Sequence, residues 1–385
     1  EIKTHLAERH PYGDWLAANQ IELHSLASQT HTLMPHDAVI KRQQLFGYTY
    51  EEMKLILEEL CVAAGVKVQL HTRIVAAQRN GRQLTAIVTE SKSGRQAWAA
   101  PVFIDTTGDG DLRARAGREF EIGREQSCLC QPMTLYALVT VNDAKALADQ
   151  LHPVGGNGRH VGPDKFKAAL AAAGVTPSYG KASLFPIKDN LVLLMANHEH
   201  GINATDAAQV TEATMRARAE VNDIVRKLSK AGGAWSGAQI VATPAQIGVR
   251  DGRRIKGRYV MTKEDLIAGR RQDDAVVRAT FPVDIHALTA EENKKAAYSN
   301  AGVKVKPYDI PLRALIARDV DGLMMAGRCI SGDFIAHASY RVTGNAVAMG
   351  EAAGVTSALA ASSKRLPHEV SWSEAAALLP KVRQG

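Results

Sequence analysis

Two short apolar segments, far apart in the chain, each end in a glycine-rich turn. The first is PVFIDTTGDGD, from Pro101 to Asp111, and the second is DGLMMAGRCIS, from Asp321 to Ser331. Each predicts a buried strand followed by a turn whose glycines let the backbone approach a ligand closely, although a plain strand-to-loop turn is the alternative for the first segment alone. The sequence TGNAVAMGEAAG (343–354) then predicts a helix whose first N–H groups favour a negatively polarised atom. Together these segments predict an α/β fold with a ligand site where the two strands end.

The composition is that of a folded protein with a large core. The chain has 385 residues, of which 45% are hydrophobic, which is enough for two domains. No apolar run reaches the ~18 residues that span a bilayer, and residues 1–20 lack the pattern of a signal peptide. The four cysteines are too few for a disulfide scaffold, so we expect a reducing, cytoplasmic location. The net charge of +7 favours an acidic partner, which includes a carboxylated or phosphorylated small molecule, a dinucleotide or nucleic acid.

The pattern of apolar residues changes twice along the chain, near residues 125 and 303. Before the first change, a helix is predicted over 50–64, followed by strands at 66–70, 74–78, 84–89 and 96–98. The middle part contains an apolar strand, a loop rich in Asn, Gly and Pro, and a polar helix over 206–230. The last part returns to a strand and a helix that ends near Ala361. We therefore expect residues 126–303 to form an inserted α+β domain.

At this point the sequence resembles a known family, the FAD-dependent oxidoreductases of the glutathione-reductase-like fold. The resemblance rests on FIDTTGDGDLRARAG (103–117) and on the segment from Leu323 to Gly354. QPMTL, GVRDGRRIKGRYVMTKEDLIAGRR, FPVDIH and YDIPLRAL follow the family's middle region in order and spacing. The resemblance implies that residues 1–125 and 304–385 build an FAD-binding domain around a substrate or cap domain at 126–303.

The same resemblance implies which residues lie against FAD. The turn after the first strand would lie near the adenosine half, and the backbone after Gly327 would follow the ribityl chain. The N-terminus of the last helix would face the pyrimidine edge of the isoalloxazine. The residues expected to contact the cofactor are Val68, Thr106, Thr107, Gly108, Asp109, Gly327, Arg328, Cys329, Ser331, Thr343, Gly344, Asn345 and Ala346.

One family feature is missing from the sequence. Members of the family begin with a βαβ unit. This unit carries G-x-G-x-x-G and an acidic residue that binds the ribose, and neither occurs before residue 45. We therefore expect an FAD-binding domain that is incomplete at its N-terminus, through truncation, processing or disorder, or one that a second chain completes. A homo-oligomer is a further expected state.

Three residues are candidates for catalysis, namely His337, Arg341 and His286, the last of them paired with Asp284. His337 and Arg341 flank the turn into the last helix, where an imidazole would act as an acid or base and a guanidinium would bind an anion. Asp284 and His286 in FPVDIH have the spacing of one strand face and form a candidate acid–base pair. The alternatives are an ordinary loop hydrogen bond for His337, a surface cation for Arg341, and structural packing for the pair.

Several other polar residues have a plainer interpretation. Cys329 lacks a C-x-x-C partner and is expected to be an inert buried thiol, and Cys128 and Cys130 lack further ligands for a metal. His198 and His200 have no evident third ligand, so no metal site is predicted. The basic run within residues 250–258 is either a solvated face or a binding site for an acidic substrate.

Three functions are compatible with these observations. The first is an FAD-dependent dehydrogenase that removes hydride from a small polar or anionic substrate. The second is a nucleic-acid-modifying flavoprotein, which ranks lower because only 5% of the residues are aromatic and stacking on bases needs aromatic side chains. The third is a non-catalytic or partner-completed subunit of a split flavoenzyme. We expect a small-molecule substrate and no membrane.

Overall fold

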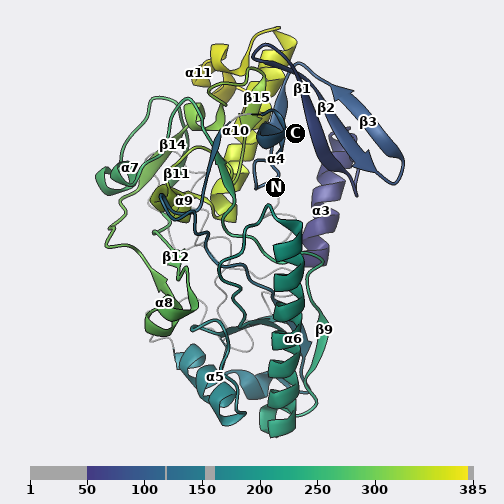
Figure 1. Ribbon diagram of the computed structural model, residues 1–385, viewed down its shortest axis with the longest axis vertical. Coiled ribbons are helices and arrows are strands. Elements are labelled where there is room, and N and C mark those ends of the chain that lie inside the picture. The colour runs from purple at the N-terminus through teal and green to yellow at the C-terminus, as the bar shows by residue number, and fades with distance from the viewer. Residues whose placement is uncertain (1–49, 118, 152–160, 380–385) are drawn as a thin grey trace.

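The computed structural model describes residues 50–117, 119–151 and 161–379 of the chain. Two hydrophobic cores organise them, one in the upper and one in the lower half of Figure 1. The upper core holds the short strands and the helix that carry the glycine-rich turns. The lower core is built around a four-stranded antiparallel sheet. A candidate site between the two strand ends is therefore part of the upper half.

The two predicted glycine-ended strands pair with each other. Strand β4 (Phe103–Asp105) lies parallel to β15 (Leu323–Met325), with Phe103 opposite Leu323 and Asp105 opposite Met325. Parallel strands end on the same edge of a sheet, so this register places both turns together. Helix α10 (Thr343–Ser362) packs against both strands, and its small residues such as Ala348 and Ala352 are buried there.

The remaining elements of the upper half complete this core. Helix α10 also packs against β11, which forms an antiparallel pair with β14. Two more two-stranded pairs, β5 with β10 and β12 with β13, lie beside them. The bounds of these elements are α4 (Asp111–Arg115), β5 (Phe120–Ile122), β10 (Arg253–Ile255), α7 (Lys263–Ala268), β11 (Ala275–Ala279), β12 (Ile285–His286), α8 (Ala290–Lys295), β13 (Tyr298–Ser299), β14 (Tyr308–Pro311), α9 (Phe334–Tyr340) and α11 (Trp372–Ala376).

A three-stranded antiparallel sheet and a helix lie at one side of the upper half (Figure 1). The sheet consists of β1 (Arg73–Asn80), β2 (Gln83–Ser91) and β3 (Gly94–Ala99), close to the predicted strands, and the helix is α3 (Tyr50–Ala63). The strand predicted over 66–70 is wrong, because residues 66–70 form no ladder with any described strand. Val66, Val68 and Leu70 alternate in sequence, yet they are 53%, 51% and 61% exposed.

Helix α3 has the predicted position but not the predicted burial. Of its apolar residues, Ile56 is buried, whereas Leu55, Leu57 and Val62 are 47%, 45% and 74% exposed. Periodicity alone identified the helix and could not tell what covers it. The partner chain that the sequence suggested stays a prediction.

The lower half is an antiparallel sheet with helices against it. The sheet has the order β7-β8-β6-β9, with β6 (Ala137–Thr140), β7 (Ser183–Lys188), β8 (Leu191–Met195) and β9 (Gln239–Ala242). Helix α6 (Ala207–Ala231) is the predicted polar helix, and Asp206 caps it by accepting hydrogen bonds from the backbone of Ala208 and Gln209. Its buried residues Ala213, Ala217, Val221 and Leu228 recur at helical spacing, so one face packs in the lower core with α5 (Val161–Ala172).

Hydrophobic packing shows which residues share each core. The lower core runs from Met133 to Ile247. Residues from Ile255 to Val303 pack with the strands and α10 of the upper core. The domain boundaries at 126 and 303 stay a prediction about sequence organisation, but the second part of that segment packs with the upper half.

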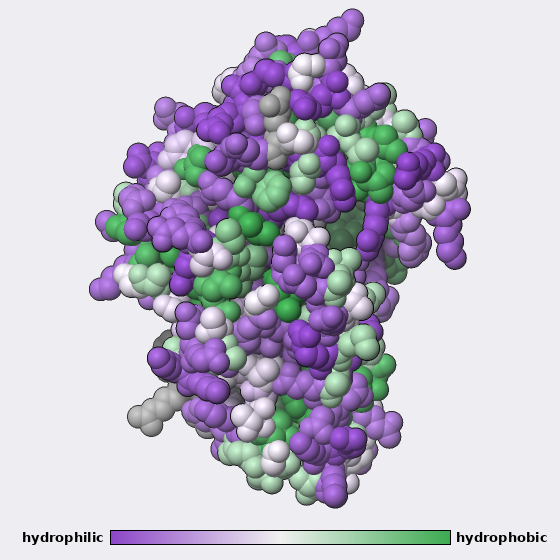
Figure 2. All heavy atoms as spheres, in the orientation of Figure 1, coloured by the Kyte–Doolittle hydropathy of each residue, from purple (hydrophilic) through white to green (hydrophobic). Residues whose placement is uncertain are grey.

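The surface is mixed in character. Figure 2 shows several separate hydrophobic areas on an otherwise hydrophilic face. Among the described residues, no helix is both long and apolar enough to cross a bilayer.

Candidate active site

The turn after β4 is fixed by one buried carboxylate. Asp105 is 1% exposed and accepts hydrogen bonds from the backbone and hydroxyl of Thr107, at 3.1 and 2.7 Å, and from the backbone of Leu112 at 3.0 Å. It therefore holds both the turn and the first residues of α4. Thr106 and Thr107 are exposed beside it. The turn is thus rigid and open on its outer side.

Arg328 joins this turn to the one after β15. Its Nη2 donates to Asp109 Oδ1 at 2.8 Å, and its guanidinium packs directly on Gly108. A Cβ atom on Gly108 would lie 1.8 Å from Arg328 Nη1, so the end of the Arg328 side chain would have to move, and Gly108 has a φ of +78°, which favours glycine. Gly327 has a φ of +87° and starts the second turn. The predicted convergence of the two turns is confirmed by these contacts.

The loop after β15 carries polar atoms without a partner. Ser331 is 2% exposed, and neither its Oγ nor Arg328 Nε has a hydrogen-bond partner among the described residues. Tyr340 of α9 holds this loop by donating from its hydroxyl to the Ile330 carbonyl at 2.9 Å. Buried polar atoms are normally hydrogen-bonded, so these two mark a place suited to a polar ligand.

The N-terminus of α10 lies open in the same way. Val342 precedes the helix and no side chain caps it, which leaves the first N–H groups to other acceptors. Thr343 is exposed, Gly344 and Asn345 are buried, and Ala346 is half-buried. Asn345 Nδ2 donates to the Tyr340 carbonyl at 3.2 Å and so fixes the helix start against α9.

A buried polar network runs from these turns to the predicted catalytic residues. Asp251 is 1% exposed, lies 3.3 Å from Arg254 Nη1, and accepts from the backbone of Gln131 at 3.3 Å. Gln131 Oε1 in turn accepts from the backbone of His286 at 3.0 Å and from Arg341 Nη2 at 3.3 Å. One amide side chain thus positions two of the predicted residues. Prediction from sequence did not identify Gln131 or Asp251, although both lie in segments that resembled the family.

His286 and Asp284 form the predicted pair. His286 Nε2 lies 3.2 Å from Asp284 Oδ2, and Arg341 Nη2 lies 3.6 Å from the same oxygen. Burial lowers the pKa of His286, against the hydrogen bond to Asp284, which raises it. Burial alone would raise the pKa of Asp284, but the hydrogen bond from His286 and the charges of Arg341 and Arg250 outweigh it and lower that pKa. A neutral imidazole beside a carboxylate is the result.

His337 and Arg341 lie on one face of α9 and its end. His337 is 0% exposed, its Nδ1 is 3.9 Å from Asp251 Oδ1, and burial holds its pKa well below the ordinary value. Burial and, after it, the charge of Arg250 lower the pKa of Arg341 to about 10, so the group stays cationic near neutrality. The alternative of an exposed surface cation for Arg341 is wrong, since its side chain is 11% exposed.

The cysteines are all free thiols. Cys329 is fully buried and its Sγ lies 3.4 Å from the Asp105 carbonyl, and burial raises its pKa. Burial also raises the pKa of Cys130 to about 12. Thiols that stay protonated are poor nucleophiles, which agrees with a structural role. No group of metal-ligating side chains is found in the described ranges.

The basic run is not a solvated face. Arg254 is 2% exposed and donates to the carbonyls of Gly332 and Gly123 at 3.0 and 2.8 Å. Arg253 donates to Asp111 at 2.8 Å, and Arg250 donates inward to the Pro132 carbonyl, also at 2.8 Å. Arg258 is exposed. Three of these cations thus make hydrogen bonds within the molecule, and the absence of a nucleic-acid partner stays a prediction.

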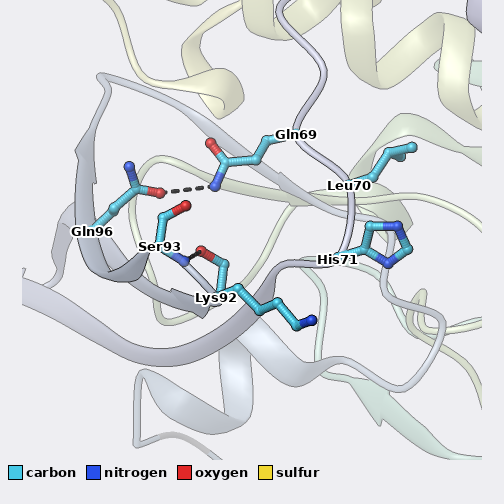
Figure 3. A pocket seen from close by; sticks show the side chains of 7 residues that line it. Gln69, Leu70, His71, Lys92, Ser93 and Gln96 are labelled. Carbon is cyan, nitrogen blue, oxygen red and sulfur yellow. Dashed lines mark hydrogen bonds between the residues drawn. The ribbon is translucent and has the colours of Figure 1, made fainter.

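Val68 lies apart from this network, in the exposed segment that leads to β1. The residues after it line a hollow of about 460 Å³, shown in Figure 3, in which Gln69 Nε2 donates to Gln96 Oε1 at 2.8 Å. His71, also on this hollow, has a φ of 55°, which is uncommon for a residue with a side chain. The structure does not test the predicted contact of Val68 with the cofactor.

Comparison with known proteins decides the family. The model of the family described as FAD dependent oxidoreductase matches residues 14–380. The chain belongs to this family. It is accordingly an enzyme, an oxidoreductase whose cofactor is FAD. The glutathione-reductase-like subclass and the incomplete N-terminus stay predictions.

The matches to individual known proteins either cover a short stretch of sequence or have low sequence identity. A stretch of 62 residues is 39% identical to ferredoxin-dependent glutamate synthase of Cyanidium caldarium, covering 16% of this chain and 4% of that protein. A geranylgeranyl bacteriochlorophyll reductase-like structure from Thermoplasma acidophilum is 11% identical, with a TM-score of 0.40, over 94% of this chain and 66% of that one. The myxobacterial chondrochloren halogenase is 10% identical, with a TM-score of 0.40, over 88% and 57%. The chain thus spans a small part of the curated relative it matches.

The residues on the two turns and α10 fit FAD. The unpartnered Ser331 Oγ and Arg328 Nε, together with the uncapped N–H groups of α10, lie on segments that the family resemblance assigns to the flavin side. Gly108, Asp109, Gly327 and Arg328 form one contiguous surface through the Arg328 contacts. Cys329 is different, because it is 0% exposed, its thiol points to Asp105, and its carbonyl accepts a hydrogen bond from the backbone of Ile255 at 2.9 Å. The roles of the individual residues stay predictions.

Proposed function

We propose that this FAD-dependent oxidoreductase removes hydride from a small polar or anionic substrate, and that His286 receives the substrate's proton. The observation that carries the proposal is the 3.2 Å contact from His286 Nε2 to Asp284 Oδ2, with His286 Nδ1 buried and without a partner. A lowered pKa keeps His286 neutral near pH 7, which is the form that accepts a proton.

The pair determines which ring nitrogen acts. Because Asp284 accepts a hydrogen bond from Nε2, the proton of neutral His286 resides on Nε2 and the lone pair resides on Nδ1. A proton leaving a hydroxyl or amino group of the substrate therefore goes to Nδ1. The imidazolium that results is stabilised by the Asp284 carboxylate, so the proton transfer is not opposed by an isolated buried charge.

The chemistry that bound FAD would supply is acceptance of a hydride from the carbon that bears this hydroxyl or amino group of the substrate. The chain positions the other groups. Arg341 holds Asp284 through its Oδ2 at 3.6 Å and its backbone carbonyl at 3.1 Å, and its cation adds positive charge beside the site. Gln131 fixes the backbone of His286 and the guanidinium of Arg341 at once. His286 is thereby positioned through its backbone by Gln131 and through its side chain by Asp284.

An anaerobic reduction assay tests this proposal. The FAD-loaded protein is mixed with a panel of small hydroxy and amino compounds, and bleaching of the oxidised-flavin absorbance is followed. For a compound that reduces the parent, His286→Asn is expected to slow flavin reduction by ~10²-fold or more, the scale of a lost general base. His368→Asn is the matched control, because His368 lies on a different hollow with Trp372. Equal rates in the parent and H286N would contradict the proposal.

A further inference from the structure

Two side chains from segments of the lower half meet beside His286. The ring of Tyr179, between α5 and β7, is tilted against the ring of His198, which follows β8, with the centroids 4.0 Å apart. The His198 ring lies 5.0 Å from the His286 ring. His198 and His286 are 3% and 7% exposed. The lower core thus contributes directly to the surroundings of the predicted proton acceptor.

The His198 ring is packed by its neighbours, but its nitrogens are unpaired among the described residues. Neither of its ring nitrogens has a hydrogen-bond partner in the described part of the chain, and burial strongly lowers its pKa, with the charge of Arg250 lowering it further. A neutral, buried imidazole with both nitrogens unpaired costs free energy unless a ligand supplies a partner. Its neutral form offers one N–H donor to such a ligand.

Of the three arginines around this cluster, the half-buried Arg250 differs from the other two in its partners. Arg254 lies 3.3 Å from Asp251, and Arg341 lies 3.6 Å from Asp284. Arg250 makes its hydrogen bonds to neutral oxygens, the Pro132 carbonyl at 2.8 Å and Thr134 Oγ1 at 2.5 Å. Among these described side chains, the charge of Arg250 has no carboxylate within ion-pair distance. An anion from outside the chain would compensate it.

Asp284 forms part of the wall of a nearby hollow. This hollow, of about 620 Å³, is lined by Phe281, Pro282, Val283, Asp284, Tyr298, Ser299 and Asn300. Its walls are largely apolar and aromatic, and Asp284 connects it to His286 and Arg341. Lys181 Nζ lies 4.0 Å from the Tyr298 ring centroid, so a further cation stands beside the hollow. The apolar part of this lining matches a ligand with an apolar body, and the charged side chain in it is Asp284.

We infer that Arg250 and His198 form the binding site for the carboxylate of the substrate, with Arg250 pairing with it and His198 donating an N–H. The inference rests on the proposed function, because it assigns the substrate of that same site to the carboxylic acids. Arg341 is occupied by Asp284, which leaves Arg250 as the cation for the ligand. The apolar lining then receives the body of the acid, next to His286.

Binding of a probe tests the inference without turnover. Benzoate is titrated into the FAD-loaded protein by calorimetry, with benzamide as the neutral match of the same shape. We expect benzoate to bind at least tenfold more tightly than benzamide. Arg250→Gln should weaken benzoate binding by tenfold or more, since an ion pair within a buried site is lost. Arg258→Gln, which removes an exposed cation from the same basic run, should leave it unchanged.

A second pair of variants keeps the test decisive if Arg250→Gln does not fold. His198→Asn retains an N–H donor and His198→Phe does not, so only His198→Phe should lose tenfold or more in benzoate affinity. Equal binding of benzoate and benzamide would overturn the inference, as would parental affinity in both R250Q and H198F. Binding that depends on Arg250, together with no flavin reduction by any carboxylic acid tested, would contradict the proposed function alone. Reduction by a neutral compound that depends on His286 but not on Arg250 would contradict this inference alone.

Discussion

At the scale of single residues, the site depends on groups whose charge is set by burial. His286 is kept neutral although it touches a carboxylate, and Asp284 is kept ionised although it is half-buried. The sequence indicated this pair through its spacing in FPVDIH. It could not indicate Gln131 or His198, because these become neighbours of His286 only through folding, across 155 residues in the case of Gln131.

Asp284→Asn should slow flavin reduction by ~10²-fold or more while the protein stays folded, because an amide neither fixes the His286 tautomer nor stabilises the imidazolium. The measurement is the anaerobic reduction rate at saturating substrate. Asp274→Asn is the control, since it removes a carboxylate from an Asp–Arg pair with Arg313 on a different hollow. Equal slowing of flavin reduction in D284N and D274N would show that a loss of stability, and not the role of Asp284, causes the slower reduction.

At the scale of secondary structure elements, the parallel pair of β4 and β15 explains why two remote glycine-rich turns act together. Their apolar residues and terminal glycines were sufficient to predict both strands, and the small residues of 343–354 were sufficient to predict α10. The strand predicted over 66–70 was wrong, because this segment has no described strand to pair with. Alternation of apolar residues shows a capacity to pair, and pairing also needs a neighbouring strand.

Gly108→Ala tests the contact of Arg328 with the turn after β4, which connects these two elements. Its Cβ would displace the Arg328 guanidinium, so we expect FAD affinity to fall by about tenfold, the equivalent of one hydrogen bond to a charged group. Gly117→Ala is a matched control, because Gly117 has a similar φ of +68° with no atom within 4 Å of the new Cβ. Both variants should lose about 1 kcal/mol of stability through backbone strain. Equal FAD affinity in the two variants would show that the contact of Arg328 with Gly108 does not contribute to FAD binding.

At the scale of the whole molecule, the candidate substrate site lies where the two cores meet. The turns that fit FAD belong to the upper half, whereas Tyr179 and His198 come from segments of the lower half. Sequence reasoning predicted that an inserted part would contribute to the substrate side. It did not predict how many neutral imidazoles this arrangement would bury.

These buried imidazoles predict how stability depends on pH. The folded-state pKa values of His198, His286 and His337 are lowered, chiefly by burial. The unfolded chain therefore binds more protons as the pH falls below ~6.5, so the stability present above that pH is lost in acid. His198 and His337, whose pKa values are lowered furthest, together give a slope of about 2.7 kcal/mol per pH unit well below pH 6.5, and His286 adds to it. Urea unfolding between pH 7.5 and 5 measures it, and a flat profile would contradict the burial of these groups.

The most direct test of the account is the pH dependence of anaerobic flavin reduction by a saturating substrate, measured in the parent and in His286→Asn. The account holds that neutral His286 takes the substrate's proton and that its pKa lies below the ordinary ~6.5. It predicts a reduction rate that is constant from about pH 7 upward and falls in acid with the titration of one group. In H286N the rate should be low and that acid limb should be absent. An unchanged acid limb in H286N would show that another group takes the proton.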